Sequence, residues 1–329
     1  MPDISVIICT HNPRPDYFRR TLEALKAKTL SKEKWELLII DNASKERLED
    51  NWDISWHPRA RHLRENELGL TAVRLSGIRE SSGELLAFVD DDNVLAQDYL
   101  ERIIAMPARY PYLGVFGAGK IEPEFEVPPP PDVVPMLSML ALKSVSSAIW
   151  SNNPKDFQSI PWGAGLVVTR GVADHYLKLV NELNVNSLLD RRGQQLFCGG
   201  DDLFSWASVG VMQGFGIFPE LRLSHLISAG RLDRNYFVRL VHDHSFSHGV
   251  LRYLLTGVQP CPPDLFGYTR MLLHGLRNGL FSMRCRWASA RGEDSAARFI
   301  SENMLRPIEV SSKGRFRGEP GESLTPSLG

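Results

Sequence analysis

The stretch Leu85-Leu86-Ala87-Phe88-Val89-Asp90-Asp91-Asp92-Asn93 decides how this chain of 329 residues is interpreted. Its apolar run is typical of a fully buried strand, because it is too short for an ordinary helix. Three carboxylates follow at once, and like charges at the end of a buried strand repel each other. The triplet is either a plain polar turn or a cation site. Oxygen ligands suit Mg²⁺ or Mn²⁺, which usually hold substrate phosphates as well.

The composition is that of a globular protein. Hydrophobic residues make up 43% and charged residues 23% of the chain, and a formal net charge of −1 argues against nucleic acid binding. The four cysteines include no C-x-x-C pair, so we expect no zinc cluster or disulfide framework and a reducing, cytoplasmic location. We also expect no signal peptide and no transmembrane helix, because no apolar run is long enough to cross a membrane.

Strand-like and helix-like segments alternate along the first hundred residues. Buried strands are predicted at 4–9 and 36–40, and apolar spacing predicts helices around 18–25 and 70–78. This alternation favours a parallel sheet with right-handed crossovers, whose ligands bind beyond the carboxyl ends of the strands. Polar residues follow three of the strands and should meet in one crevice: Thr10, His11 and Asn12; Asp41 and Asn42; and Asp90, Asp91 and Asp92.

The second half is predicted from weaker signals. The proline run Pro128 to Pro131 predicts an extended segment that is either a spacer or a substrate-facing loop. A disordered tail is expected where Gly, Ser and Pro accumulate. The remaining elements are expected as a strand at 164–168, a helix from Asp201 to Val211, a strand at 215–223 interrupted by Pro219, a helical region at 236–310 and the tail at 311–329.

The order of the motifs resembles that of the family 2 glycosyltransferases, inverting enzymes of the GT-A fold. The resemblance covers residues 4–228 and departs from the family at Cys9, where Pro is usual, and at Asp201, where Glu is usual. It implies an α/β fold with a mostly parallel central sheet flanked by helices. Its six motifs are Ser5 to Asn12, Asp41 to Ser44, Asn66 to Gly69 with Arg74 and Gly77, the D-x-D-like Asp90 to Asp92, Gly199 to Leu203, and Pro219 with His225.

The resemblance implies a nucleotide-sugar site. Asp92 and His225 would bind a divalent metal, Mn²⁺ or Mg²⁺, which bridges the two phosphates of the donor, and an imidazole ligand favours Mn²⁺ somewhat. Asp41 could instead only close an Asx-turn, and Arg74 could be a solvated helix residue or pair with phosphate. The residues implied to bind the nucleotide-sugar are Thr10, His11, Asn12, Asp41, Asn42, Asn66, Arg74, Asp90 and Asp91, the last of which could also contact the metal.

The same resemblance implies an acceptor side. Asp202 is the candidate general base, because an acceptor hydroxyl is a poor nucleophile at neutral pH. Asp201 is the alternative base, and either residue could merely cap a helix. Four further residues are expected to shape the acceptor pocket: Trp162, Gly163, Gly199 and Gly200.

The predicted function is metal-dependent, inverting transfer of a sugar from a UDP-, dTDP- or GDP-sugar to a hydroxyl of a saccharide or lipid-linked saccharide, in cell-surface polysaccharide or glycolipid synthesis. A sugar-phosphate nucleotidyltransferase is one alternative, but it needs a glycine-rich loop after the first strand and Thr10 to Pro15 contains no glycine. A non-catalytic nucleotide-sugar-binding protein is the other, although it would not need Asp92, Asp202 and His225.

The predicted domains are a glycosyltransferase domain at 1–235, a helical C-terminal region at 236–310 and the tail at 311–329. The first comprises a nucleotide-binding half, 1–95, and an acceptor-binding half, 96–235. Between Tyr268 and Ala290, and at Arg291 just beyond, arginines alternate with apolar residues. This stretch is either a helical hairpin packed on its own domain or a peripheral contact with anionic lipid at the inner face of the membrane.

Overall fold

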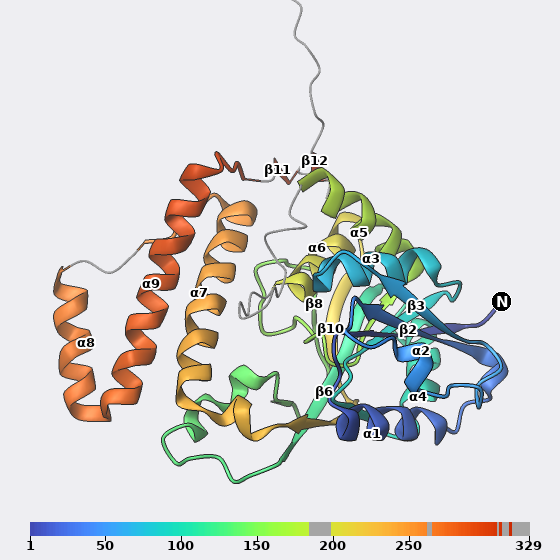
Figure 1. Ribbon diagram of the computed structural model, residues 1–329. Coiled ribbons are helices and arrows are strands. Elements are labelled where there is room, and N and C mark those ends of the chain that lie inside the picture. Colours follow the sequence, from blue (N-terminus) through green and yellow to red (C-terminus); the bar gives the residue numbers. More distant parts are fainter. Residues whose placement is uncertain (184–198, 262–264, 308, 311–315, 318–329) are drawn as a thin grey trace, which may run out of the picture.

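The computed structural model describes residues 1–183, 199–261, 265–307, 309–310 and 316–317. Within this part of the chain, a twisted ten-stranded sheet lies beside a group of C-terminal helices (Figure 1). The strand order is β3-β2-β1-β4-β9-β6-β10-β5, with β7 paired to β6 and β8 paired to β10. The predicted α/β fold is confirmed.

The element bounds are as follows. The strands of the sheet are β1 (Ile4–Thr10), β2 (Trp35–Asn42), β3 (Ala60–Glu65), β4 (Leu85–Val89), β5 (Asn93–Leu95), β6 (Leu113–Phe125), β7 (Lys143–Ser144), β8 (Ile149–Ser151), β9 (Leu166–Thr169) and β10 (Gly214–Ile227). The helices are α1 (Pro15–Lys26), α2 (Leu48–Asn51), α3 (Leu70–Glu80), α4 (Tyr99–Arg109), α5 (Arg170–Leu183), α6 (Gly200–Gly210), α7 (Arg234–Thr256), α8 (Leu265–Asn278) and α9 (Leu280–Glu302). Short 3-10 helices are η1 (Lys32–Lys34), η2 (Val134–Leu140) and η3 (Ala229–Leu232), and β11 (Glu309–Val310) pairs with β12 (Phe316–Arg317).

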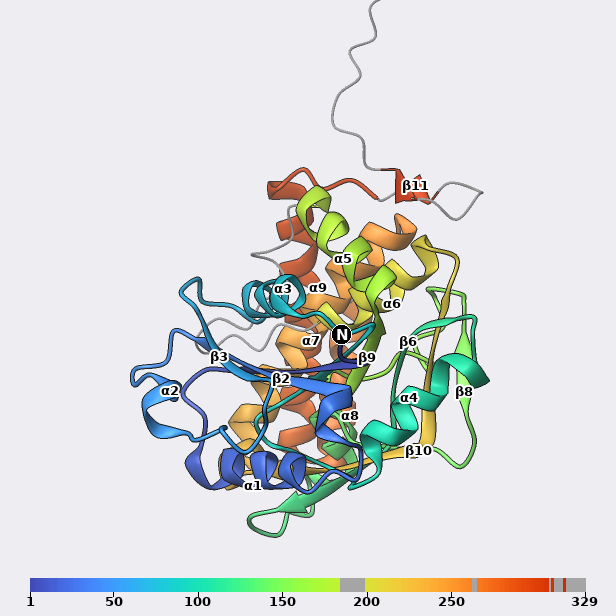
Figure 2. The ribbon, with the colours of Figure 1, turned by 90° about the vertical axis from the view of Figure 1, so that its right-hand side faces the viewer.

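The first four strands of the order are parallel. Of these, β2, β1 and β4 are buried because helices cover both faces, whereas the edge strand β3 is partly exposed. β1 pairs in parallel with β2 and β4, and β2 with β3. Ile7 packs in the core on the side of α3, whereas Val6 and Ile8 pack with Phe18 of α1 on the other face. Figure 2 shows α1 and α4 on one side of the sheet and α3, α5 and α6 on the other. Apolar runs on both faces of a strand are what such a covered sheet requires.

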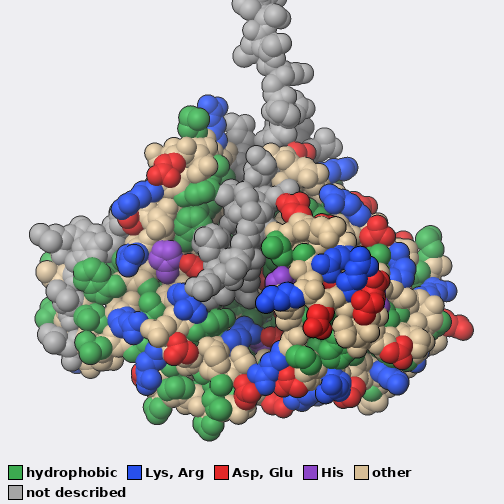
Figure 3. All heavy atoms as spheres, in the orientation of Figure 1, with side chains coloured by type: hydrophobic (Ala, Val, Ile, Leu, Met, Phe, Trp, Pro, Cys, Tyr) green, Lys and Arg blue, Asp and Glu red, His purple; other side chains and the backbone are tan. Residues whose placement is uncertain are grey.

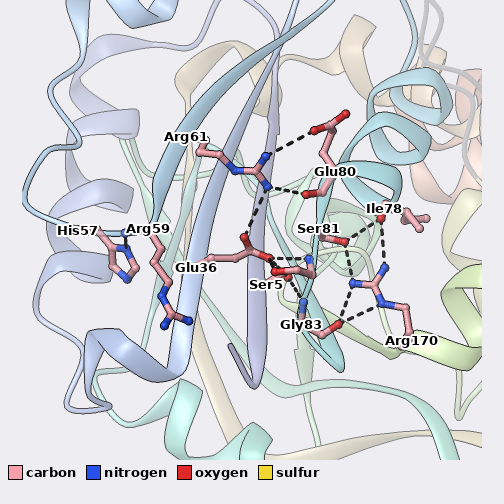
Figure 4. A network of polar contacts seen from close by, with 11 residues as sticks. Ser5, Glu36, His57, Arg59, Arg61, Ile78, Glu80, Ser81, Gly83 and Arg170 are labelled. Atoms are coloured by element: carbon pink, nitrogen blue, oxygen red, sulfur yellow. Dashed lines mark hydrogen bonds and ion pairs between the residues drawn. The ribbon is translucent and has the colours of Figure 1, made fainter. Parts of the chain in front are cut away.

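A buried polar network holds the amino ends of the parallel strands together (Figure 4). The Ser5 hydroxyl and the backbone N–H of Ser82 each donate to Glu36 Oε1 at 2.6 Å, and the Ser82 hydroxyl donates at 2.8 Å. The Arg170 guanidinium donates to the Gly83 carbonyl at 2.7 Å. These hydrogen bonds connect β1, β2 and the turn before β4 with one another and with the start of α5. They therefore stabilise the end of the sheet that lies opposite the predicted crevice.

The sheet changes direction at β9. This strand pairs antiparallel with both β4 and β6, whereas β6 and β10 pair in parallel. The sequence predicts a strand interrupted at Pro219, but β10 continues through Pro219 with a register shift between Phe218 and Arg222. A bulge absorbs the residue that cannot donate a ladder hydrogen bond.

The C-terminal helices form a group of their own beside the sheet, as predicted for residues 236–310 (Figure 1). α7 and α9 approach closely because small residues face each other: a Cβ on Gly249 would lie 2.9 Å from that of Ala296. α8 packs on α9 where Gly275 meets Met283. No helix of the described residues is long and apolar enough to cross a membrane. The predicted disordered tail, 311–329, lies outside the described residues except for 316–317.

Candidate nucleotide-sugar site

The loops after β1, β2 and β4 meet in one crevice, as the sequence predicts. Thr10 lies opposite Asp41 in the β1–β2 register. The Thr10 hydroxyl donates to Asp91 Oδ2, and His11 Nδ1 lies 2.6 Å from the Asn42 carbonyl. Parallel strands place their carboxyl ends at the same edge, so side chains far apart in sequence come together there. Figure 3 shows a hollow between the sheet and the C-terminal helices with charged side chains inside it.

Asp92 and His225 are brought together by the antiparallel pairing of β5 with β10. This register puts His225 opposite Asn93, directly after Asp92. His225 Nε2 then lies 3.3 Å from Asp92 Oδ2. Asn93, which is fully buried, donates from Nδ2 to Asp92 Oδ1 at 2.9 Å and so leaves Oδ2 facing the histidine.

The Asp92–His225 pair offers one oxygen and one nitrogen ligand to a divalent metal. No group of three or more His, Cys, Asp or Glu side chains in the described residues is arranged to hold a metal alone. Mn²⁺ and Mg²⁺ in nucleotide sites are commonly held by few protein ligands and completed by phosphates. The donor set therefore fits a metal that binds together with a diphosphate.

Arg231 of η3 lies between the two candidate metal ligands. Its Nη1 is 2.9 Å from Asp92 Oδ2 and 2.9 Å from His225 Nε2. A guanidinium group only donates hydrogen bonds, so His225 Nε2 is the acceptor in its contact with Arg231. The crevice thus holds a cation where the metal ligands meet.

The neighbouring carboxyl groups of Asp90 and Asp91 have raised pKa values. Burial and the adjacent Asp92 raise the pKa of Asp91 to about 7, although the bond from Thr10 opposes the shift. Burial and Asp92 also raise the pKa of Asp90, against the effect of Arg74. Crowded carboxylates that resist ionisation are typical of sites completed by a bound cation.

The donor-side loops are held by side-chain to backbone hydrogen bonds. Asn42 accepts from the Gly69 N–H at 2.9 Å and donates to the Glu67 carbonyl at 2.6 Å, which fixes the loop containing Asn66. Asn12 accepts from the Lys45 N–H at 2.9 Å. These residues shape the loop edges of the crevice, while Asn66 is itself exposed.

Asp41 is already engaged on both carboxylate oxygens. Oδ1 accepts from the Ser44 N–H at 2.8 Å, which is the Asx-turn alternative considered above, and Oδ2 accepts from Arg64 Nη1 at 2.6 Å. The predicted contact with a nucleobase would use the second lone pair of either oxygen. That contact stays a prediction.

Asp201 and Asp202 have different surroundings although they are adjacent at the start of α6. Asp201 Oδ1 lies 2.7 Å from Arg74 Nη2, and Oδ2 accepts from the Gly163 N–H at 2.8 Å. The Arg74 side chain is only 5% exposed, so the alternative of a solvated helix arginine is wrong. Burial and the charge of Asp201 raise the pKa of Asp202 to about 7.

Two of the predicted glycines, Gly163 and Gly200, lie against the Arg74–Asp201 ion pair. A Cβ on Gly163 would lie 2.8 Å from Arg74 Nη2 and 2.9 Å from Asp201, and one on Gly200 would lie 2.6 Å from Arg74 Nη1. Gly199 adopts φ 119° at the start of α6, a conformation that L side chains rarely adopt. Gly163 and Gly200 thus leave room for the Arg74–Asp201 pair, whereas Gly199 suits the backbone conformation before α6.

Three residues at the site were not predicted from the sequence: Asn93, Arg231 and Lys143. Lys143 Nζ donates to the Ile160 carbonyl at 3.1 Å and lies 5.2 Å from the centre of the Trp162 ring. Its charge acts on Asp202 and partly opposes the rise of that pKa. Asn93 directly follows the acidic triplet, which was a usable signal. Arg231 and Lys143 stand in no motif, so only the fold reveals them.

A separate hollow of about 720 Å³ lies between α1 and α2. Asn12 and Ser44 line its edge, but none of Asp90, Asp92 or Asp202 does. Trp52 and Trp56 form part of its wall. The candidate carboxylates and His225 do not line this hollow and lie in the crevice at the strand ends.

Residues 5–132 match the family described as glycosyl transferase family 2. Over these residues the chain is similar to the family 2 glycosyltransferases, and the predicted resemblance is confirmed for this part of the chain. The matched range includes the acidic triplet but ends before Asp202, His225 and Arg231.

Relatives and solved structures agree with this assignment. Glycosyltransferase AglE of Haloferax volcanii is 31% identical over 105 residues, 31% of this chain and 34% of that protein. Putative glycosyltransferase EpsH of Bacillus subtilis is 29% identical over 105 residues, 31% of this chain and 30% of that protein. The chain thus matches about a third of the length of these relatives.

The mannosyltransferase PcManGT of Pyrobaculum calidifontis, solved with GDP-Man and Mn²⁺, superposes with a TM-score of 0.52 and 16% identity, over 92% of this chain and 79% of that one. This likeness shows the GT-A fold.

Proposed function

We propose that this protein is a metal-dependent, inverting glycosyltransferase. It transfers a sugar from a nucleoside-diphosphate-sugar to a hydroxyl of a saccharide or lipid-linked saccharide. The observation that carries the proposal is the contrast within the acidic pair: Asp201 is bound by Arg74 and Gly163, whereas Asp202 is the carboxylate whose pKa is raised to about 7. A base is most effective when its pKa lies near the working pH.

Different residues act on the donor and on the acceptor. A metal held by Asp92 and His225 would neutralise charge on the departing diphosphate. Arg74 fixes Asp201 and leaves Asp202 to accept the proton of the acceptor hydroxyl. Trp162 supplies an apolar ring face against which a sugar ring stacks. Displacement is direct, so the anomeric configuration inverts. This assignment favours an enzyme over a non-catalytic binding protein, which has no use for a tuned base.

The test uses Asp202→Asn and Asp201→Asn with UDP-, GDP- and dTDP-sugars. Asp202→Asn keeps shape and hydrogen bonding but not basicity, so donor binding should persist while turnover falls about 10²- to 10⁴-fold. NMR of the product should show an inverted anomeric centre. Retained configuration, or normal turnover of Asp202→Asn, would contradict the mechanism.

We also propose that α8 and α9 contact anionic lipid, which would bring the site to a lipid-linked acceptor. On each helix two exposed apolar residues alternate with two exposed arginines, and the intervals between them are the same in both helices. The residues are Phe266, Arg270, Leu273 and Arg277 on α8, and Leu280, Arg284, Trp287 and Arg291 on α9. No Asp or Glu occurs from 265 to 292. Figure 3 shows hydrophobic and basic side chains side by side over these helices. Such faces bind the interface of charged membranes.

Co-sedimentation with vesicles tests the lipid contact. Binding should require phosphatidylglycerol, weaken with salt and fall when Arg270, Arg277, Arg284 and Arg291 are changed to Gln. The matched control is Arg298→Gln, which removes an exposed arginine of α9 that pairs with Asp294. Equal binding of both variants, or none at low ionic strength, would reject the contact while leaving the glycosyltransferase proposal intact.

A further inference from the structure

The position of Arg231 has a consequence for the metal, because His225 Nε2 carries a single lone pair. In this structure Arg231 Nη1 uses that lone pair at 2.9 Å. A metal bound by His225 needs the same lone pair. The guanidinium and the metal therefore exclude each other at Nε2.

Arg231 is held in this position by its surroundings and does not approach as a loose surface chain. Its side chain is 22% exposed. The 3-10 helix that carries it begins at Ala229, whose N–H donates to Glu126 Oε2 at 2.8 Å. Glu126 is in turn bound by Arg14 at 2.6 Å. From this half-buried position Arg231 makes a charge-assisted hydrogen bond to Asp92 at 2.9 Å.

Arg231 also prepares the two ligands. Its guanidinium only donates hydrogen bonds, so the contact with His225 uses the Nε2 lone pair, the same lone pair that a metal ligand needs. Asn93 holds the other Asp92 oxygen at 2.9 Å, which keeps Oδ2 pointing to the same place. The ligand pair is thus set in a metal-binding arrangement by a side chain that occupies the position of the metal.

We infer that Arg231 is the resident cation of this site: its guanidinium holds Asp92 and His225 ready, and a divalent metal binds only when Arg231 moves away. The inference rests on the proposed metal function of Asp92 and His225. Metal loading is then an exchange of one cation for another, and the metal affinity measured for the protein includes the free energy of breaking the Arg231–Asp92 ion pair.

The test is a Mn²⁺ titration of chelator-treated, dialysed full-length protein, without nucleotide and with UDP or GDP against protein-free blanks, followed by the electron paramagnetic resonance signal of free Mn²⁺. Arg231→Gln removes the competing charge, so this variant should bind Mn²⁺ at least about 10-fold more tightly than the wild type. This factor corresponds to the loss of one charged hydrogen bond. The matched control is Arg234→Gln, which removes a nearby exposed ion pair with Asp132 and should not change the Mn²⁺ affinity.

Two further variants separate the possible results. Arg231→Lys keeps the charge and should stay within about threefold of the wild type. Asp92→Asn should abolish Mn²⁺ binding in both the wild-type and the Arg231→Gln background. A gain in affinity cannot come from a failure to fold.

If Arg231→Gln binds Mn²⁺ no better than the wild type, or Arg231→Lys tightens binding as much as Arg231→Gln, the inference is overturned. If Mn²⁺ binds equally well to Asp92→Asn, the proposed metal site itself is wrong.

Discussion

Asp201 and Asp202 show how surroundings assign different properties to identical neighbours. Both begin α6, where a carboxylate is favourable for the helix in any protein. Arg74 and the Gly163 N–H occupy Asp201, whereas burial and the charge of Asp201 raise the pKa of Asp202 to about 7. The sequence alone could name the pair but could not choose between them, because the choice depends on an arginine more than a hundred residues away.

The raised pKa predicts a pH dependence of catalysis. A base must be unprotonated to accept the acceptor proton, so kcat/KM should fall about tenfold for each pH unit below 7 and reach a plateau above it. The measurement is a pH–rate profile at saturating metal. The small residual rate of Asp202→Asn should lack this step. A wild-type profile that is flat from pH 5.5 to about 8 would contradict the role given to Asp202.

Among single residues, the predictable ones stand in contiguous motifs. Asp90 to Asp92 and the pair Asp201 and Asp202 were visible because several acidic residues follow one another. Arg231 was not, because a lone arginine after a strand has many ordinary explanations. Its meaning comes from the 2.9 Å contacts with Asp92 and His225, which are far from each other in sequence and adjacent only in the folded sheet.

Helices and strands were easier to predict than their pairing. The apolar runs of β1, β2 and β4 and the spacing of α1 and α3 follow directly from burial. The antiparallel direction of β9 did not follow, because a buried strand has the same pattern in either direction. The interruption predicted at Pro219 is a register shift within one continuous strand, because a bulge and a break have the same local signature.

The close contact of α7 with α9 gives a prediction about stability. A Cβ on Gly292 would lie 2.4 Å from the His242 carbonyl oxygen and 3.0 Å from the Phe246 nitrogen, both backbone atoms. Gly292→Ala should therefore push the helices apart and lower the free energy of unfolding by about 1–3 kcal/mol. Thermal or urea unfolding measures the change.

The control for this prediction is Gly171→Ala in α5, where a Cβ would meet no atom within 4 Å. In a helix this replacement should raise stability by about 0.5–1 kcal/mol. If both variants shift the unfolding midpoint in the same direction, the tight crossing of α7 and α9 does not limit stability.

The complete fold joins a predicted glycosyltransferase part, 1–235, to predicted helices at 236–310, and α7 begins at Arg234, close to that boundary. Whether the two parts are separate domains stays a prediction. The first part was predictable because its motifs follow one another in family order. How α8 and α9 lie beside it was not, because an amphipathic helix has the same pattern whether it covers protein or lipid.

Donor binding should stabilise the whole protein. A ligand that binds only the native state raises the free energy of unfolding, by about 2.7 kcal/mol at one hundred times its Kd. Thermal shifts with UDP-, GDP- and dTDP-sugars should therefore be larger with Mn²⁺ than with chelator for the nucleotide that is the donor. Asp92→Asn should lose the metal-dependent part, and Glu80→Gln, at the opposite end of the sheet, should keep it. Identical shifts with and without Mn²⁺ would argue against a shared metal–diphosphate site.

The pairing of β5 with β10 also bears on the order in which the molecule is assembled during synthesis. His225 and Arg231 reach Asp92 only after β6, β9 and β10 have joined the sheet, and contacts between such distant segments form slowly. A growing chain that has emerged as far as β4 already exposes three crowded carboxylates without their later partners. The proposed metal site is therefore completed late, when the long strand β10 pairs with the short strand β5, which was synthesised much earlier.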